Sequence, residues 1–139
     1  MDSNLKRSII LDHYQNPRNK GLTDDSGYVS VNMNSESCID EVNIMAKIEN
    51  DRIGDIQYDG EACAICTSST SIMTETLIGK TLEEAREIVN NFDNMINEKE
   101  YNKDVLKDLN VYEEIYLQPN RKTCALLPTK AIRKVLENM

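Results

Sequence analysis

Alternating apolar and polar residues predict three strands in the first half of the chain. The apolar positions of these runs are Val29, Val31 and Met33, then Val42, Ile44, Ala46 and Ile48, and then Ile53, Ile56 and Tyr58. Alternation with a period of two, clearest in the second run, places such residues on one face of a strand. The turn-like segment 49–52 joins the second and third runs. Because short connections join antiparallel neighbours, we expect a meander rather than a parallel sheet.

Helical periodicity accounts for much of the remaining chain. Apolar residues recur on one face at positions 5–14, and a second helix is expected to begin within a residue or two of Cys63. A third helix follows Thr81, which with Glu84 forms the pattern of a capping box. Its apolar stripe, spaced at intervals of three and four, is Leu82, Ala85, Val89, Phe92 and Ile96. These helices are expected to pack against the sheet.

The chain between this stripe and the C-terminus is less regular. Val105, Leu106 and Leu109 support a short helix, and the segment 111–117 fits either a final helical turn or an irregular ledge. We expect the segment 119–124 to be a loop that carries the last cysteine. The terminal helix then follows, with Pro128 compatible with its first turn and with an apolar face of Ala131, Ile132, Val135 and Leu136.

Composition points to an ordinary globular protein. The 139 residues are 40% hydrophobic and 29% charged, so we expect one compact domain, 1–139. A net charge of −8 argues against a nucleic-acid partner, because phosphate binding needs a basic face. No apolar run approaches membrane length, and the first residues do not resemble a signal peptide. We therefore expect a cytoplasmic protein without a membrane partner.

The chemistry concentrates in the cysteines, because four thiols in the cytoplasm are more often metal ligands or reactive groups than a disulfide framework. Cys38 and Asp40 fall on the connection between the first two predicted strands, and Cys63 lies just beyond the third. With Cys124 they offer three sulfurs and one carboxylate, enough for a four-coordinate site. Zinc accepts such ligands, and thiolates also hold iron–sulfur clusters. The competing interpretation is that these are buried, inert cysteines.

Two further residue types invite a metal or redox interpretation. Cys63 and Cys66 form a C-x-x-C at a helix start, a pattern found in redox pairs and in half of a zinc site. No second C-x-x-C exists and the strand order is not thioredoxin-like, so we interpret Cys66 as a small buried residue or a thiol beside the site. His13, the only histidine, lacks ligand-spaced neighbours and is interpreted as capping or flanking the first helix.

Several motifs, in order along almost the whole chain, resemble the U-type iron–sulfur cluster assembly proteins, the family of IscU, SufU and the NifU N-terminal domain. They are Asn16-Pro17-Arg18-Asn19-Lys20-Gly21, Cys38-x-Asp40, Gly60-x-Ala62-Cys63-Ala64-Ile65, Ser71-Ile72-Met73-Thr74-Glu75, Gly79-Lys80-Thr81 and Pro119-x-Arg121-x-x-Cys124. The resemblance implies an α+β fold, a small three-stranded antiparallel sheet with helices packed on one face and a metal site at one end. It also implies that the metal ligands are Cys38, Asp40, Cys63 and Cys124.

Within that family the chain is most similar to the SufU branch. Thr123 stands where the scaffold branch has histidine, and the separation from Cys63 to Cys124 (124 − 63 = 61 positions) is longer than in that branch. The resemblance implies a zinc-dependent sulfurtransferase that accepts persulfide sulfur from a cysteine desulfurase. Cys124 is the expected attacking thiol, with Arg121 beside it. The sulfur would pass to a downstream scaffold or an apo-protein.

Two alternatives stay open. The same ligands suit a scaffold on which a [2Fe–2S] cluster is assembled and passed on. A third hypothesis is a family member whose metal only stabilises the fold. It is motivated by Ile39, which replaces the glycine of the family's Cys-Gly-Asp motif, where a side chain resists a close backbone approach.

Overall fold

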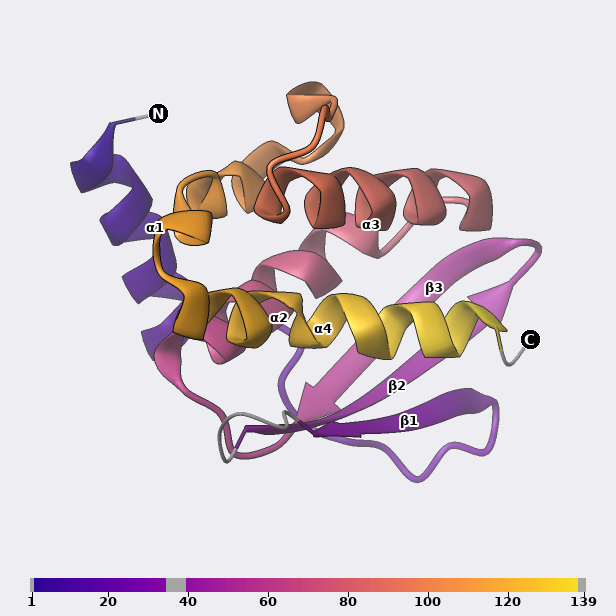
Figure 1. Ribbon diagram of the computed structural model, residues 1–139. Helices are drawn as coiled ribbons and strands as arrows, with labels where there is room; N and C mark the ends of the chain where they lie inside the picture. Colours follow the sequence, from indigo (N-terminus) through magenta and orange to yellow (C-terminus); the bar gives the residue numbers. More distant parts are fainter. Residues whose placement is uncertain (1, 35–39, 138–139) are drawn as a thin grey trace.

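The computed structural model describes residues 2–34 and 40–137 and has the α+β architecture expected from the sequence (Figure 1). In chain order its elements are α1 (Ser3–Gln15), β1 (Tyr28–Asn34), β2 (Glu41–Glu49), β3 (Arg52–Asp59), α2 (Ala64–Leu77), α3 (Leu82–Ile96), the short 3₁₀ helices η1 (Lys103–Val105), η2 (Lys107–Tyr112) and η3 (Ile115–Leu117), and α4 (Pro119–Glu137).

Within the described residues the strands form one antiparallel sheet of three strands in the order β1-β2-β3, which confirms the predicted meander. Tyr28 of β1 lies opposite Lys47 of β2 at one end of the ladder. The turn between β2 and β3 consists of Asn50 and Asp51, whose φ angles are 52° and 61°. A two-residue turn with both residues left-handed matches the twist of the flanking strands, and asparagine and aspartate tolerate that conformation.

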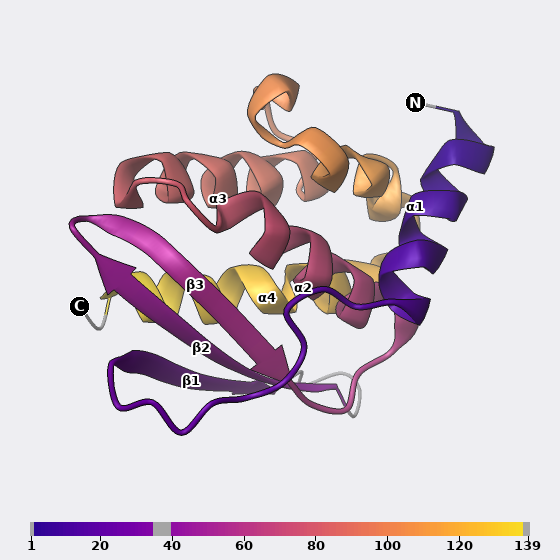
Figure 2. The same ribbon diagram turned by 180° about the vertical axis from the view of Figure 1, so that it is seen from behind.

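The helices cover one face of the sheet (Figure 2). On that face Val42, Ile44 and Ala46 of β2 are almost fully buried. α4 lies across β1 and β2, α2 contacts the end of β3, and α3 packs on α4. Apolar side chains fill the space between sheet and helices, and the core continues between α3, α4 and the 3₁₀ segment. The expectation that the third helix packs directly on the sheet is wrong, because α3 packs mainly on α4.

α2 is a buried helix rich in small hydroxyl residues, and it packs closely on α4. Ser68, Ser69, Thr70 and Ser71 are inaccessible to solvent. Ser69 Oγ donates to the carbonyl oxygen of Ala125 on α4 at 3.3 Å. Small side chains keep the two backbones near enough for such a bond, so the cysteine at the start of α2 comes close to the early turns of α4.

The expected loop at 119–124 is instead the first part of α4, so that prediction is wrong. Pro119 is the first helical residue, a position where the missing N–H costs nothing and the fixed φ suits the helix. Pro128, expected in the first turn, lies inside the helix. It has no N–H to donate to the carbonyl oxygen of Cys124, four residues earlier. Cys124 consequently sits on a helix rather than on a free-standing loop.

The capping box of α3 is confirmed: Thr81 Oγ1 accepts from the N–H of Glu84 at 3.1 Å, and Glu84 Oε1 accepts from the N–H of Thr81 at 3.0 Å. The short helix predicted near Val105 is present only as the 3₁₀ turns η1 and η2.

Two salt bridges join α1 to the end of the 3₁₀ segment. Lys6 Nζ lies 2.9 Å from Glu113 Oε1 and 2.6 Å from Glu114 Oε1. These carboxylates raise the pKa of Lys6, chiefly through the hydrogen bond to Glu113. α1 is thereby held against the segment that leads into α4.

Candidate metal centre

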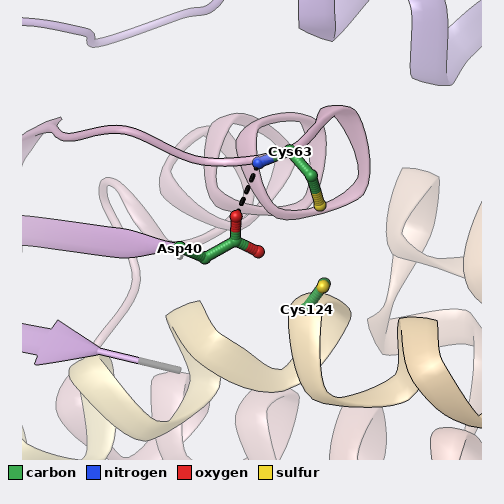
Figure 3. A group of neighbouring side chains, drawn as sticks. All are labelled: Asp40, Cys63 and Cys124. Atoms are coloured by element: carbon green, nitrogen blue, oxygen red, sulfur yellow. Dashed lines mark hydrogen bonds between the residues drawn. The ribbon is translucent and has the colours of Figure 1, made fainter. Parts of the chain in front are cut away.

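Three of the four predicted ligands meet at one end of the sheet. Asp40 directly precedes β2, Cys63 is the N-cap of α2, and Cys124 lies in the second turn of α4. Their ligand atoms, one carboxylate oxygen and two sulfurs, all lie within 4.8 Å of one another. Figure 3 shows the two sulfur atoms pointing toward each other, with the Asp40 carboxylate beside them. This convergence of residues far apart in sequence is the central feature of the site.

The three side chains are largely shielded from water. Asp40 and Cys124 are each 3% exposed, whereas Cys63 is half-buried. The Cys124 thiol donates to the carbonyl oxygen of Asn120 at 3.8 Å within the first turns of α4. Two sulfur donors and one carboxylate at this separation have the chemistry of a zinc site, which uses thiolate and carboxylate ligands in tetrahedral geometry.

Backbone groups hold Asp40 and Cys63 in place. The N–H of Cys63 donates to Asp40 Oδ1 at 2.8 Å. Cys63 caps α2, and its Sγ accepts from the N–H of Cys66 at 3.5 Å. Nearby, the N–H of Glu41 donates to the carbonyl oxygen of Glu61 at 2.8 Å. The start of β2 is thus tied directly to the segment that enters α2.

Gly60 makes this close approach possible. Its φ is +146°, and a Cβ added there would lie 2.0 Å from the carbonyl oxygen of Glu41. Only glycine fits at such a distance from another backbone. The sequence motif around Cys63 contains Gly60, but the motif alone does not indicate this contact. The usable signal was a glycine directly after a strand and before the cysteine, since glycine there often marks close backbone contact.

A cleft of about 630 Å³ opens beside Asp40 and Cys63. Its lining comes from α1, the segment after α1, the residue before β2, the connection from β3 to α2, and α2 itself. The residues are Tyr14, Lys20, Asp40, Gly60, Glu61, Ala62, Cys63 and Thr67. Cys63 is therefore reachable from solvent. A separate groove of about 390 Å³ between α3 and α4 is lined without cysteine or histidine and offers no comparable chemistry.

Two predicted site residues, Cys38 and Arg121, and the single histidine complete the comparison with the sequence. Cys38 and Ile39 lie outside the described residues, so the fourth ligand stays a prediction. Arg121 is exposed on α4, one turn before Cys124. His13 is buried on α1, where its Nδ1 is hydrogen-bonded to Ser71 Oγ at 2.8 Å, and it is not one of the grouped ligands.

Fold and site together define a small α+β protein with a cysteine–aspartate group at one end that could hold a metal ion. The sequence profile of the NifU-like N terminal domain matches residues 5–138. The chain belongs to this family.

Similar proteins agree with that assignment. The zinc-dependent sulfurtransferase SufU of Bacillus subtilis (strain 168) is 37% identical over 94% of this chain and 88% of its own length. The iron–sulfur cluster assembly scaffold protein IscU of Streptococcus pyogenes serotype M1 is 29% identical over 97% and 84%. A crystal structure of an iron–sulfur cluster assembly scaffold protein for the SUF system from Fervidobacterium islandicum AW-1 superposes with a TM-score of 0.89, at 31% identity, covering 97% of this chain and 99% of the other.

Proposed function

We propose that this protein is a zinc-dependent sulfurtransferase of iron–sulfur cluster assembly, which accepts persulfide sulfur from a cysteine desulfurase. The observation that carries the proposal is the convergence of Asp40, Cys63 and Cys124 within 4.8 Å. Similarity to the SufU of Bacillus subtilis, which is named a zinc-dependent sulfurtransferase, supports it. Cys38, two residues before Asp40, supplies the fourth ligand in this proposal.

The donor set fits zinc. Cys63 and Cys124 supply two sulfurs and Asp40 an oxygen, and a further cysteine would complete four-coordination. When bound, zinc would keep the thiols deprotonated and prevent their pairing with one another. None of the described helices is long and apolar enough to cross a membrane. The cytoplasmic location expected from the sequence stays a prediction.

Sulfur transfer requires one thiolate to attack the terminal sulfur of the partner's persulfide. We assign this step to Cys124. A new S–S bond forms on Cys124, and the desulfurase cysteine leaves as a thiolate. Arg121 lies three residues earlier on the same helix, a spacing that places two side chains on one face. Its guanidinium would steer the anionic persulfide toward the site and stabilise the Cys124 thiolate.

Desulfurase turnover tests this proposal. With purified cysteine desulfurase and cysteine, the zinc-loaded protein should raise alanine formation and acquire a persulfide detectable by intact mass. Cys124→Ser should lose both effects, because attack needs the sulfur itself. Zinc-stripped protein should also lose them, because zinc is proposed to keep the thiols deprotonated. Arg121→Ala should lower the rate about two- to fivefold, as expected for an exposed charge, whereas the neighbouring Lys122→Ala serves as the matched control. Equal turnover with wild type, stripped protein and Cys124→Ser would contradict the proposal.

Cluster scaffolding is the second candidate, favoured by the scaffold proteins among the relatives. It uses the same ligands to hold a [2Fe–2S] cluster before passing it to an acceptor. Anaerobic incubation with iron and sulfide distinguishes the two. A stable coloured cluster together with unchanged desulfurase turnover would favour the scaffold. The sulfurtransferase would instead show the turnover gain and deliver its sulfur to a scaffold or apo-protein.

A further inference from the structure

The pair Cys63 and Cys66 has a feature that the proposed sulfur transfer does not use. We propose that these residues are a redox-active dithiol: oxidation by a peroxide joins them in a disulfide and removes Cys63 from the metal-binding group. The inference that the two thiols form a disulfide depends on the structure alone. The inference that oxidation weakens metal binding rests on the proposed function, because it requires Cys63 to be a ligand.

The two residues share one helix start. Cys63 is the N-cap of α2, and its Sγ accepts from the backbone N–H of Cys66 at 3.5 Å. This contact places the Cys63 sulfur over the first turn, against the residue that carries the second thiol. Three-residue spacing at a helix start is the arrangement of reactive C-x-x-C pairs. Closing so short a loop also costs little chain entropy.

The two thiols differ in their access to solvent. Cys63 is half-buried and lines the 630 Å³ cleft, whereas Cys66 is fully buried and does not line it. The pKa of Tyr58 is raised to about 12, first by burial and also by its proximity to Cys66. Burial likewise raises the pKa of Tyr112, with smaller contributions from Cys66 and Cys63. Cys66 therefore lies on the interior side, near two buried phenols, and a small oxidant reaches Cys63 first.

This asymmetry gives each thiol a distinct part in the reaction. The Cys63 thiolate attacks one oxygen of hydrogen peroxide, which forms a sulfenic acid and, with one proton, a water molecule. The Cys66 sulfur then attacks the sulfenic sulfur, the S–S bond forms, and the hydroxyl leaves with the Cys66 proton as a second water. In sum two thiols and one peroxide give one disulfide and two waters. The thiols lose two electrons and the peroxide gains them.

Cys124 is the competing partner for Cys63. The two sulfurs lie within 4.8 Å of one another but belong to different helices. A disulfide needs a sulfur separation of about 2.05 Å, so this bond would require side chains on two separate helices to move together. The Cys124 thiol also donates a hydrogen bond to the carbonyl oxygen of Asn120. The bond to Cys66 needs rearrangement only within the first turn of α2.

Peptide mapping of metal-free protein tests the pair without any desulfurase or zinc. The protein is treated with one equivalent of hydrogen peroxide, blocked with N-ethylmaleimide and digested with trypsin. Cleavage after Lys47, Arg52, Lys80 and Lys122 separates the Cys63–Cys66 peptide from those of Cys38 and Cys124. We expect that peptide to lose two hydrogen atoms and take no maleimide, while the other two are each labelled once. A Cys63–Cys124 link, or an oxygen adduct on Cys63 with Cys66 still labelled, would overturn the proposal.

The effect of oxidation on zinc binding is measured separately: zinc released from zinc-loaded protein is followed with a chromophoric chelator. Peroxide should release zinc in proportion to the disulfide formed, and dithiothreitol should restore full rebinding. Cys66→Ala should lose this recovery, because Cys63 without its partner proceeds to sulfinic acid, which dithiothreitol does not reduce. Circular dichroism verifies that the variant is folded, and Cys66→Ser is a second variant if it is not. Full recovery by either folded variant would refute the protective role of Cys66. If the protein binds no zinc, the proposed function fails while the mapping still decides the dithiol.

Discussion

Asp40 and Cys63 are joined by a hydrogen bond: the N–H of Cys63 donates to Asp40 Oδ1 at 2.8 Å. Asp40 therefore has two roles at once, since it anchors the start of α2 and offers a carboxylate beside the sulfurs of Cys63 and Cys124. A buried carboxylate that binds a backbone N–H is fixed in orientation before any metal arrives. The two roles can be separated by substitution.

Asp40→Asn should keep the fold and lose metal affinity. The amide oxygen can still accept from the N–H of Cys63, but the negative charge is gone, so we expect zinc affinity to fall at least about tenfold. Asp40→Ala should additionally lower the free energy of unfolding of the metal-free protein by about 1–3 kcal/mol, because it leaves that N–H without its acceptor. Competition with a zinc chelator and urea unfolding measure the two effects. Equal zinc affinity in wild type and Asp40→Asn would remove Asp40 from the ligand set.

Gly60→Ala should destabilise the protein by more than about 3 kcal/mol, because its Cβ would lie 2.0 Å from the carbonyl oxygen of Glu41. Gly21→Ala is the matched control: Gly21 also has a positive φ, +126°, but nothing lies within 4 Å of its Cβ position. That control should cost about 1–3 kcal/mol from backbone strain alone. Urea unfolding of both variants gives the comparison. Similar losses in the two would mean that the contact with Glu41 relaxes easily.

Zinc should stabilise the folded chain. A metal that binds only the folded state, at about a thousand times its dissociation constant, adds about 4 kcal/mol. Chelation should then lower the melting temperature by about 10 °C or more. Cys66→Ala should lower the melting temperature of the metal-free protein, because Cys66 is fully buried. Zinc should still raise the melting temperature of this variant by the same amount as in wild type. Loss of the increment in this variant would place Cys66 among the ligands and displace Asp40.

The stability of the metal-free protein should fall as the pH drops below about 6.5. Burial lowers the pKa of His13 in the folded state, with a smaller contribution from Arg18. Below the ordinary histidine pKa the unfolded chain takes up a proton that the folded chain resists, so unfolding is favoured. The slope is at most about 1.4 kcal/mol per pH unit for one proton.

Because His13 is the only histidine in the sequence, one variant isolates its contribution. His13→Asn keeps a polar group near Ser71 but has no proton to gain. Urea unfolding between pH 5.5 and pH 7.5 should show a steeper decline for wild type than for His13→Asn. Parallel curves would mean that His13 titrates equally in the folded and unfolded chain.

Local pattern in the sequence predicts the elements whose burial is periodic. The strands around Val31, Ile44 and Ile56 and the stripe of α3 each repeat apolar residues at the period of their own structure, and the structure confirms all four. The capping box of Thr81 and Glu84 is equally local, because it depends on residues three apart.

The beginning of α4 could not be predicted in the same way. Pro119 is compatible both with a loop and with the first turn of a helix, and Pro128 normally argues against a helix interior. Packing of the surrounding apolar face on α2 and the sheet settles the matter in favour of one long helix. The family resemblance, by contrast, predicted which residues group as candidate ligands. The contact of Gly60 with Glu41, however, is a relationship between two backbones that composition and spacing do not encode.

The distribution of the grouped ligands along the chain has a consequence for biosynthesis. Asp40 lies just before β2, Cys63 caps α2 and Cys124 is on α4, so the group is complete only when the last helix has packed on the second. A nascent chain emerges from the ribosome from its N-terminus, and its sheet and α2 are available before α4 is made. During that interval Cys63 and Cys66 are already together on one helix, whereas Cys124 is still absent. The group of three side chains is therefore complete only late in the synthesis of the chain.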